Sequence, residues 1–423
     1  MEPKVTEVSD ENDRLTFRIS GINVSLANSI RRIILSEIPT IVFKTFPHNK
    51  NKANIEINTS RFNNEIVKQR LSCLPIHITD IDFNYTDHSI EIDKKNTTDV
   101  IQYVTTGDIK IKNTKNDSYL SDAEVNKIFP PDNITAQHID IVRLRPALSK
   151  TLDGEHLKLN CAFSVGTAKD NSSYNVASTC CYKASQDVAK MTGIWSEMER
   201  KYKSEKKSKE EIAAIKDDWL LLDAKRIILP DSFEFIVESV GVFSASSIVE
   251  KACQVMINKL EKFVKDISEK SDMILPSENT IDNCYDINLV GEDYTLGKAI
   301  EYLMYAMYYE TTGESKVVTY CGFIKPHPHI DKSIIRVAFV GTTIPLRITS
   351  SPSSVSSTFS TTESSRMDIA KKVIKRIVSN TELTSSANFG LMEWGYYWNP
   401  YLKLRVPINS NGAATIYTDV DGV

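Results

Sequence analysis

The hydrophobic pattern predicts that the chain opens with a strand, a glycine and an amphipathic helix. Residues 15–19 alternate apolar and polar side chains with a period of two, which is typical of a half-buried strand. Gly21 follows, and from Leu26 to about Glu37 apolar side chains return every three or four residues, the spacing of one helical face. Pro39 then ends the helix, because proline cannot continue its hydrogen bonding.

Two adjacent arginines, Arg31 and Arg32, lie on this predicted helix. At about 100° per residue, Arg32 points almost opposite the apolar face and Arg31 lies on its flank. Both arginines are therefore expected to face outward from a packed helix. Ordinary solvated surface arginines are the alternative interpretation.

The same layout recurs late in the chain. Residues 285–289 alternate as residues 15–19 do, Gly291 follows them, and an apolar helical face begins after Thr295. Between the two copies, a long amphipathic helix is expected after Ser247. Two copies of one unit in a single chain predict an internal pseudo-two-fold dimer whose helices pack together. The residues expected at this internal dimer interface are Ile30, Ile33, Ile34, Val255, Leu260, Phe263, Leu296, Ile300, Leu303 and Met304.

The predicted fold class is α+β, with two dimerisation units made of mixed sheets and a helix bundle, and a β-rich insert domain in the first unit. Short β-like runs fill the insert, and its last part, 184–226, is charge-dense and favours helix. Nine basic and eight acidic residues nearly cancel between Glu197 and Arg226, so a solvated helix is expected there rather than a nucleic-acid-binding arm. The expected domains are a first unit at 1–78 and 232–275, the insert at 79–231, a second unit at 276–390 with a Ser/Thr-rich loop at 350–365, and an aromatic tail at 391–423.

Composition and charge narrow the function classes. Apolar residues make up 41% and charged residues 25% of the 423 residues, which is ordinary for a folded chain. The formal net charge of −4 argues against a chain that binds polyanions as a whole. No run approaches the roughly 18 apolar residues of a membrane span, and the amino terminus lacks the apolar stretch of a secretory signal. A cytoplasmic protein without membrane contact is therefore expected.

The sequence offers no chemistry that would make the chain an enzyme by itself. Its seven cysteines are scattered without a C-x-x-C pair, so a structural zinc site is not expected. His327 and His329 stand two apart on a proline-stiffened turn, but only Asp331 is near enough in sequence to complete a metal site. No phosphate-binding glycine loop, H-E-x-x-H or nucleophile motif is present. No catalytic residue, metal or cofactor is expected.

Residues 28–40 read Asn-Ser-Ile-Arg-Arg-Ile-Ile-Leu-Ser-Glu-Ile-Pro-Thr, and residues 69–76 read Gln-Arg-Leu-Ser-Cys-Leu-Pro-Ile. These segments resemble the first-helix signature, and the segment that follows it, in the alpha-like subunit of multisubunit RNA polymerases (bacterial alpha, archaeal D). The second half is similar to the small partner subunit, archaeal L. The chain therefore resembles a fusion of the two partners, as in large cytoplasmic DNA viruses. Residues 166–170 and 235–241 also resemble the alpha-like subunit, and residues 291–297 and 322–328 resemble the small partner subunit.

The resemblance implies a non-catalytic role in transcription. In this family the paired subunits form a platform on which the second-largest and then the largest subunit assemble, and those two hold the magnesium and the active site. The implied partners are the largest, second-largest and smaller polymerase subunits, with DNA and RNA contacted only through the complex. A viral source would place the protein in the host cytoplasm and the virion. The residues expected to face the second-largest subunit are Asn28, Arg31, Arg32, Glu37 and Arg70.

The sequence also departs from the family. Gln69 and Tyr294 replace usual histidines, and the cysteine pairs that hold zinc or an iron–sulfur cluster in some members are missing, so no metal is carried over. The alternative function is a stand-alone nucleic-acid-binding module. The net charge of −4 and the lack of a Lys/Arg stripe interleaved with aromatic residues speak against that alternative.

Overall fold

The structure is a computed structural model that describes residues 3–79, 84–147, 153–270, 272–310 and 316–340. It also describes two short paired strands, β16 (Leu404–Arg405) and β17 (Tyr417–Thr418). The predicted Ser/Thr-rich loop at 350–365 and the rest of the predicted aromatic tail lie outside the described residues.

The first sheet contains four antiparallel strands in the order β1-β2-β11-β10. Alternate side chains of β2 point into the core, so Leu15, Phe17 and Ile19 are buried, as the period-two pattern predicts. The rings of Phe17 on β2 and Phe235 on β11 stack with their centroids 5.1 Å apart. The strands span Lys4–Glu11 (β1), Arg14–Ser20 (β2), Ala177–Gln186 (β10) and Ile228–Ser239 (β11).

The second sheet, in the order β12-β13-β15-β14, repeats the connectivity of the first. In each sheet the second strand (β2 or β13) leads into a helix. Two later strands (β10 and β11, or β14 and β15) pair with each other, and the last of them (β11 or β15) also pairs with the second strand. The glycines that end the second strands, Gly21 and Gly291, have φ values of 76° and 75°, a left-handed conformation that glycine adopts readily. The strands span Ile274–Pro276 (β12), Cys284–Val290 (β13), Val318–Ile324 (β14) and Lys332–Phe339 (β15).

Three helices connect these sheets. They are α1 (Val24–Ser36), α6 (Ala245–Glu269) and α7 (Tyr294–Met304), and α7 continues into a π-helical turn at Tyr305–Tyr309. Each helix begins two or three residues before its predicted start. The side chains of Asn23 and Asp293 accept hydrogen bonds from the backbone N–H groups of Ser25 and Thr295, so each N-cap stands two residues after the glycine.

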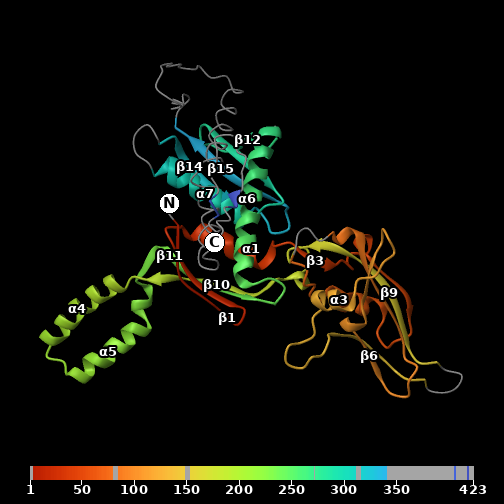
Figure 1. Ribbon diagram of the computed structural model, residues 1–423. Helices are drawn as coiled ribbons and strands as arrows, with labels where there is room; N and C mark the ends of the chain where they lie inside the picture. The colour runs from red at the N-terminus through yellow and green to blue at the C-terminus, as the bar shows by residue number, and fades with distance from the viewer. Residues whose placement is uncertain are drawn as a thin grey trace.

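The first hydrophobic core is shared by both sheets and these helices. It contains buried side chains from β2, β11, α1, α6, α7, β13 and β15 in one continuous cluster. Figure 1 shows the two sheets on opposite sides of α1, α6 and α7. The helix faces of the two repeated units thus bury their apolar side chains against each other.

A second core lies in the segment between α1 and β10. It joins buried side chains from Phe43 to Phe163, so the predicted boundary between residues 78 and 79 falls inside this core. β9 pairs with β3, β4 and β5, and β5 pairs with β7. The elements are β3 (Thr40–Phe43), β4 (Ala53–Asn58), α2 (Asn64–Ser72), β5 (His88–Lys95), β6 (Gln102–Thr105), β7 (Lys110–Asn113), α3 (Asp122–Ile128), β8 (Asp140–Leu144) and β9 (His156–Gly166), with 3-10 turns at His48–Lys50, Tyr85–Asp87, Thr106–Asp108 and Ser172–Tyr174.

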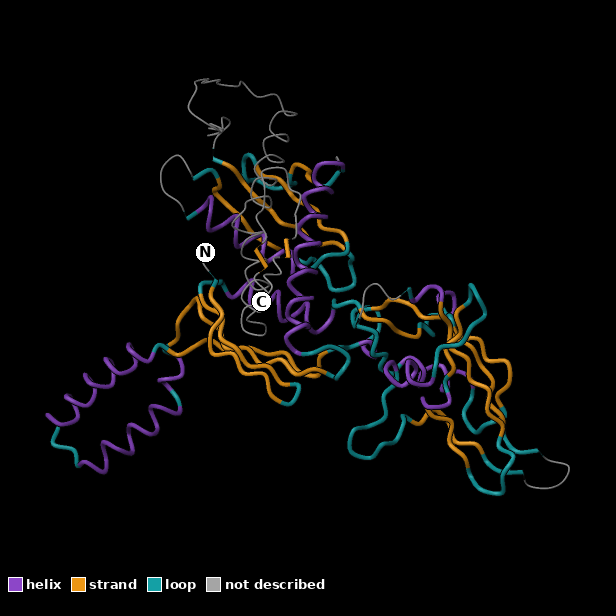
Figure 2. The backbone as a smooth tube through the Cα atoms, in the orientation of Figure 1, coloured by secondary structure: helices purple, strands orange, loops and turns teal. Residues whose placement is uncertain are grey.

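The charge-dense segment forms a helical hairpin between β10 and β11 (Figure 2). Its helices are α4 (Val188–Ser204) and α5 (Lys209–Leu221), followed by a 3-10 turn at Asp223–Arg226. The prediction of a solvated helix is wrong in one respect, because Trp195 and Trp219 bury each other and form a third, small core. Within the hairpin, Lys203 and Glu199 form an i,i+4 ion pair with a nitrogen–oxygen distance of 2.6 Å. None of the described helices is long and apolar enough to cross a membrane.

Candidate functional site

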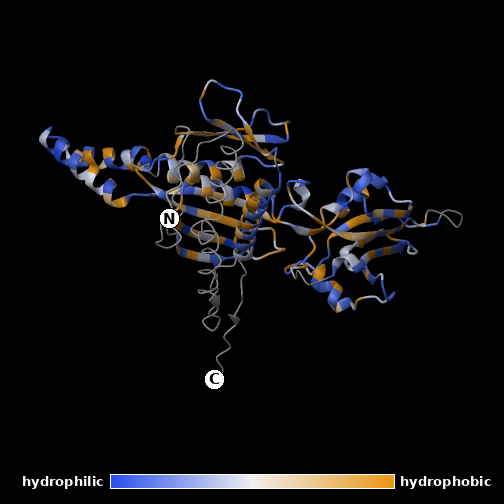
Figure 3. Cartoon of the chain, turned by 90° about the horizontal axis from the view of Figure 1, so that it is seen from above, coloured by the Kyte–Doolittle hydropathy of each residue, from blue (hydrophilic) through white to orange (hydrophobic). Residues whose placement is uncertain are grey.

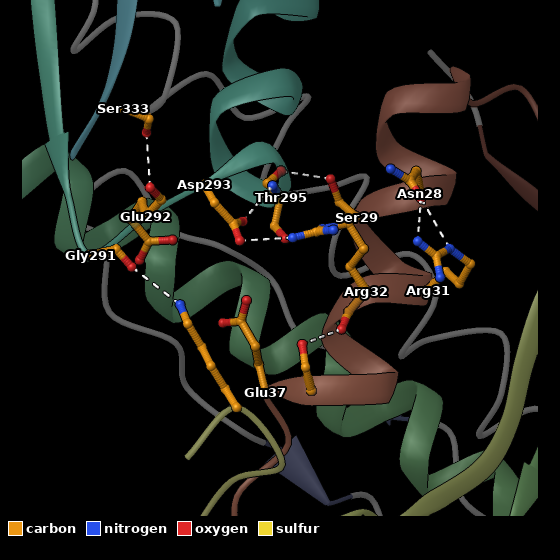
Figure 4. A network of polar contacts seen from close by, with 12 residues as sticks. Asn28, Ser29, Arg31, Arg32, Glu37, Gly291, Glu292, Asp293, Thr295 and Ser333 are labelled. Atoms are coloured by element: carbon orange, nitrogen blue, oxygen red, sulfur yellow. Dashed lines mark hydrogen bonds and ion pairs between the residues drawn. The ribbon is translucent and has the colours of Figure 1, made fainter. Parts of the chain in front are cut away.

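The candidate site is the junction where α1 meets α7 (Figure 4). Arg32 Nε donates to Thr295 Oγ1 at 2.9 Å, and one of its terminal nitrogens donates to Asp293 Oδ2 at 2.8 Å. Its guanidinium also lies 5.9 Å from the centre of the Tyr294 ring. Arg32 is therefore a contact between the two repeated units, and the expectation that it faces outward is wrong, because α7 covers the side of α1 opposite its own sheet.

Asp293 is held as a carboxylate at this junction. Burial raises the pKa of Asp293, but the hydrogen bond from the Thr295 backbone N–H and the charge of Arg32 outweigh it and hold the pKa below its ordinary value. Water reaches the Arg32–Asp293 ion pair only in part, because the Arg32 side chain is 30% exposed and the Asp293 side chain 28%.

Ser29 makes the most buried polar contact of the junction. Its hydroxyl oxygen lies 2.7 Å from the backbone carbonyl oxygen of Thr295 and 2.8 Å from that of Ser25 on its own helix, so its single hydrogen is shared between two acceptors. Ser29 is only 2% exposed and Thr295 only 1%. A serine side chain is small enough to let the two helix backbones approach closely, and it satisfies a buried carbonyl there.

A second polar cluster joins three segments beside the first. Lys259 on α6 lies 2.6 Å from Glu37 Oε2 at the end of α1 and 2.7 Å from Glu292 Oε2, just after β13. The side chains of all three are at most 17% exposed. Burial lowers the pKa of Lys259, but its two carboxylate partners outweigh this and raise it, so the lysine stays charged. Lys169 adds a link to this region by donating to the Gly291 carbonyl at 3.3 Å.

Asn28 and Arg31 stand apart from these contacts. The Asn28 side-chain oxygen accepts two hydrogen bonds from the Arg31 guanidinium, at 3.0 and 2.9 Å, along one face of α1. Figure 4 shows Arg31 on the side of α1 that turns away from Asp293 and Thr295. The two side chains hold each other through these hydrogen bonds and are half-exposed.

Arg70 belongs to a different part of the molecule. It lies on α2 within the second core region, where its guanidinium donates to the carbonyls of Ile141 and Asp140 at 2.6 and 2.7 Å and lies over the Phe62 ring. The structure therefore does not gather the five predicted partner-contacting residues into one cluster. Asn28 and Arg31 form one group, Arg32 and Glu37 belong to internal contacts, and Arg70 ties α2 to β8.

The predicted apolar interface residues all meet in one place. Eight of them are buried in the first core, and Ile30 and Val255 pack against it. The polar residues of the junction were harder to predict. No local signal in the sequence shows that a distant segment binds Ser29, Lys259, Glu292 or Asp293. Asp293 does match Asn23, since each is the N-cap residue two positions after a glycine.

The chain also carries side chains of the kinds that bind metals or act as nucleophiles. Among the described residues, no group of three or more His, Cys, Asp or Glu side chains is placed to hold a metal ion. All seven cysteines are free thiols. Burial raises the pKa of Cys161, Cys180, Cys253 and Cys321 to about 12, so these thiols are not nucleophiles near neutral pH.

Comparison with known proteins gives a consistent result. The RNA polymerase Rpb3/Rpb11 dimerisation domain matches residues 16–260. DNA-directed RNA polymerase subunit Rpo3 of Pyrococcus horikoshii is 23% identical over 279 residues, covering 62% of this chain and 97% of that protein. Subunit 3B of DNA-directed RNA polymerases IV and V of Arabidopsis thaliana is 26% identical over 330 residues (66% and 92%). Subunit RPAC1 of DNA-directed RNA polymerases I and III of Homo sapiens is 22% identical over 298 residues (61% and 82%).

Proposed function

The chain belongs to the RNA polymerase Rpb3/Rpb11 dimerisation-domain family, and from this membership we propose that it is a non-catalytic assembly subunit of a DNA-directed RNA polymerase. The observation that carries the proposal is the family match over residues 16–260, more than half of the 423-residue chain. The relatives from Pyrococcus, Arabidopsis and human are all RNA polymerase subunits by name. The second-largest and largest subunits are the proposed partners that assemble on it and carry out catalysis.

The finer proposal is that the chain contains both members of the pair. The second sheet repeats the strand order of the first, and Gly21 and Gly291 occupy the same place in the two repeats. The apolar faces of α1 and α7 lie in one core, and Arg32 and Ser29 bond across to Asp293 and Thr295. These observations support an internal pseudo-two-fold dimer. Fusion would make the association intramolecular, with an effective concentration near millimolar for a short linker.

The proposed contact with the second-largest subunit centres on Asn28 and Arg31. Arg31 keeps a planar fork of donors that can bind carboxylates or carbonyls of another chain. Arg32 and Glu37, whose charges are used within the chain, are proposed to hold α1 in position beneath that surface. Arg70 is proposed to act indirectly. Its guanidinium already binds two carbonyls of β8, so it holds the second core region in position for the partner instead of contacting the partner itself.

The direct test is mass spectrometry of the affinity-tagged full chain purified from the cells in which it is made. The expected result is co-purification with two large polymerase chains, while the purified single chain incorporates no nucleotides. Recovery of the chain alone from a lysate that contains those two subunits would contradict the assembly role.

A separate experiment tests the internal pair. A protease site is inserted between α6 and β12, and the folded full chain is cleaved there before gel filtration. The two pieces are expected to elute together, since the first core joins them. Separate elution at micromolar concentration would refute the internal dimer and leave the family membership untouched.

The proposed source is viral, with action in the host cytoplasm and the virion, and it rests on the resemblance to fused subunits of large cytoplasmic DNA viruses. The alternative function, a stand-alone nucleic-acid-binding module, is not favoured, because the net charge of the whole chain is −4.

A further inference from the structure

The α4–α5 hairpin is an arm that packs on itself. Trp195 and Trp219 lie with their ring centroids 5.5 Å apart and form a separate core with Ile212 and Ala224. Figures 1 and 3 show the arm projecting from the end of the first sheet, away from the second sheet and the insert. Its first helix has 17 residues, which at about 1.5 Å per residue carries the tip about 25 Å outward.

The turn at the end of the arm is well defined by hydrogen bonds. The Ser208 backbone N–H donates to Glu211 Oε2 at 2.9 Å, and the Glu211 backbone N–H donates to Ser208 Oγ at 3.1 Å, which is a capping box. The Lys207 backbone N–H donates to the Tyr202 carbonyl at 3.2 Å, and the Lys207 ammonium lies 4.3 Å from the Tyr202 ring centre. The tip therefore presents its side chains from a fixed backbone.

Positive charge gathers at this turn. Six of the ten residues from 200 to 209, which we call the basic tip, are lysine or arginine, and one is glutamate. Lys203 pairs with Glu199 and Lys207 with Glu205. Within the part of the chain that the structure describes, Arg200, Lys201, Lys206 and Lys209 form no ion pair, and all four are exposed. The near-neutral balance of the whole segment conceals this excess, because four of the eight carboxylates between Glu197 and Arg226 lie on α5 and only one, Glu205, lies within the basic tip.

The basic tip lacks the features of a protein-binding surface. Protein interfaces depend on buried aromatic or aliphatic anchors. No large hydrophobic side chain between Lys190 and Trp219 is exposed, and the exposed ones of the arm, Val188 and Leu220 to Leu222, lie at its base, away from the basic tip. Exposed lysines without an apolar centre instead suit a phosphate backbone, which binds point charges irrespective of sequence. We propose that the basic tip of the α4–α5 hairpin contacts the phosphate backbone of a nucleic acid.

The proposal is independent of the assembly role, because it concerns an arm that projects from the shared core. It also differs from a stand-alone nucleic-acid-binding function, since four free cations supply only weak, salt-sensitive attraction. Four phosphate contacts would give a slope of about −3.6 in a plot of log affinity against log salt concentration on duplex DNA.

The test is a titration of labelled duplex DNA, and of duplex RNA, with the purified full chain between about 50 and 200 mM salt. The variant replaces Lys201, Lys206 and Lys209 by glutamine. The expected result is a loss of at least tenfold in affinity at the lowest salt and a salt slope smaller in magnitude by about 3. The matched control replaces Lys110, Lys127 and Lys262 by glutamine, which changes the net charge equally at exposed lysines elsewhere.

The control variant is expected to bind as the unchanged protein does. Three results would overturn the proposal: no binding of DNA or RNA by the unchanged chain at the lowest salt, equal losses in the two variants, or displacement of the nucleic acid by poly-glutamate at equal charge. The last result would assign the basic tip to an acidic polypeptide. Circular dichroism of both variants verifies that the hairpin remains helical.

Discussion

Ser29 donates its hydroxyl hydrogen to the carbonyl oxygen of Thr295 at 2.7 Å, although the two residues are 266 positions apart in sequence. The bond joins the middle of α1 to the first turn of α7, at the centre of the core that both repeated units share. Around it, Arg32 and Lys259 reach the segment that precedes α7. Most of the contact between the units is therefore apolar, and its few polar bonds fix how the helices are placed against each other.

Replacing Lys259 by methionine should destabilise the protein by about 3 kcal/mol, because it leaves the Glu37 and Glu292 carboxylates close together without their shared cation. The free energy of unfolding in urea measures this. A triple variant that also carries Glu37→Gln and Glu292→Gln should recover most of the loss. If Lys259→Met alone costs less than the triple variant, the cluster does not act as an ion triad.

Arg32→Ala and Arg31→Ala should affect different properties. Loss of Arg32 removes its bonds to Asp293 and Thr295 and should lower the free energy of unfolding by about 1–3 kcal/mol. Loss of Arg31 removes a contact within α1 alone, so stability should change by less than about 0.5 kcal/mol. Arg31→Ala should nevertheless reduce the yield of assembled polymerase, as measured by co-purification. The assignment fails if Arg31→Ala assembles normally.

Gly297→Ala should destabilise the second unit. A Cβ at this position of α7 would lie 2.0 Å from a ring carbon of Phe323, so the ring would have to move, at a cost of about 1–3 kcal/mol. Gly193 lies inside α4 with nothing within 4 Å of such a Cβ. Gly193→Ala should therefore be neutral or stabilising by up to about 1 kcal/mol, because alanine favours helix. Thermal unfolding of the two variants compares them directly.

Asp293 should contribute to loss of stability in acid. Its pKa in the folded protein is lowered, so its contribution is fully present above the unfolded value of about 3.9 and is lost as the pH falls through the folded pKa. Asp293→Asn should be less stable than the unchanged protein near pH 7, with the difference shrinking below about pH 4. Urea unfolding at several pH values measures the difference. A constant difference across that range would show that ionisation of Asp293 is not involved.

Strands β2 and β13 and the amphipathic helices α1, α6 and α7 could be predicted from the sequence, because side-chain periodicity depends only on the local backbone. The same periodicity identified the apolar faces of α1, α6 and α7, whose predicted residues all reach the first core. The repeat of strand, glycine and helix was also visible, since the left-handed glycine is a local requirement.

Tertiary structure decided how the polar residues are used. A helical pattern shows which side chains share a face, but not which distant element covers the opposite face, so Arg32 was expected in solvent and lies against α7. Net charge over a segment likewise does not show where its cations are placed, and only the fold of the α4–α5 hairpin puts Lys206 and Lys209 at the end of an arm. The basic run at 200–209 can be read from the sequence, but the contact that covers Arg32 and the packing that makes the arm join residues remote in sequence, which no local pattern encodes.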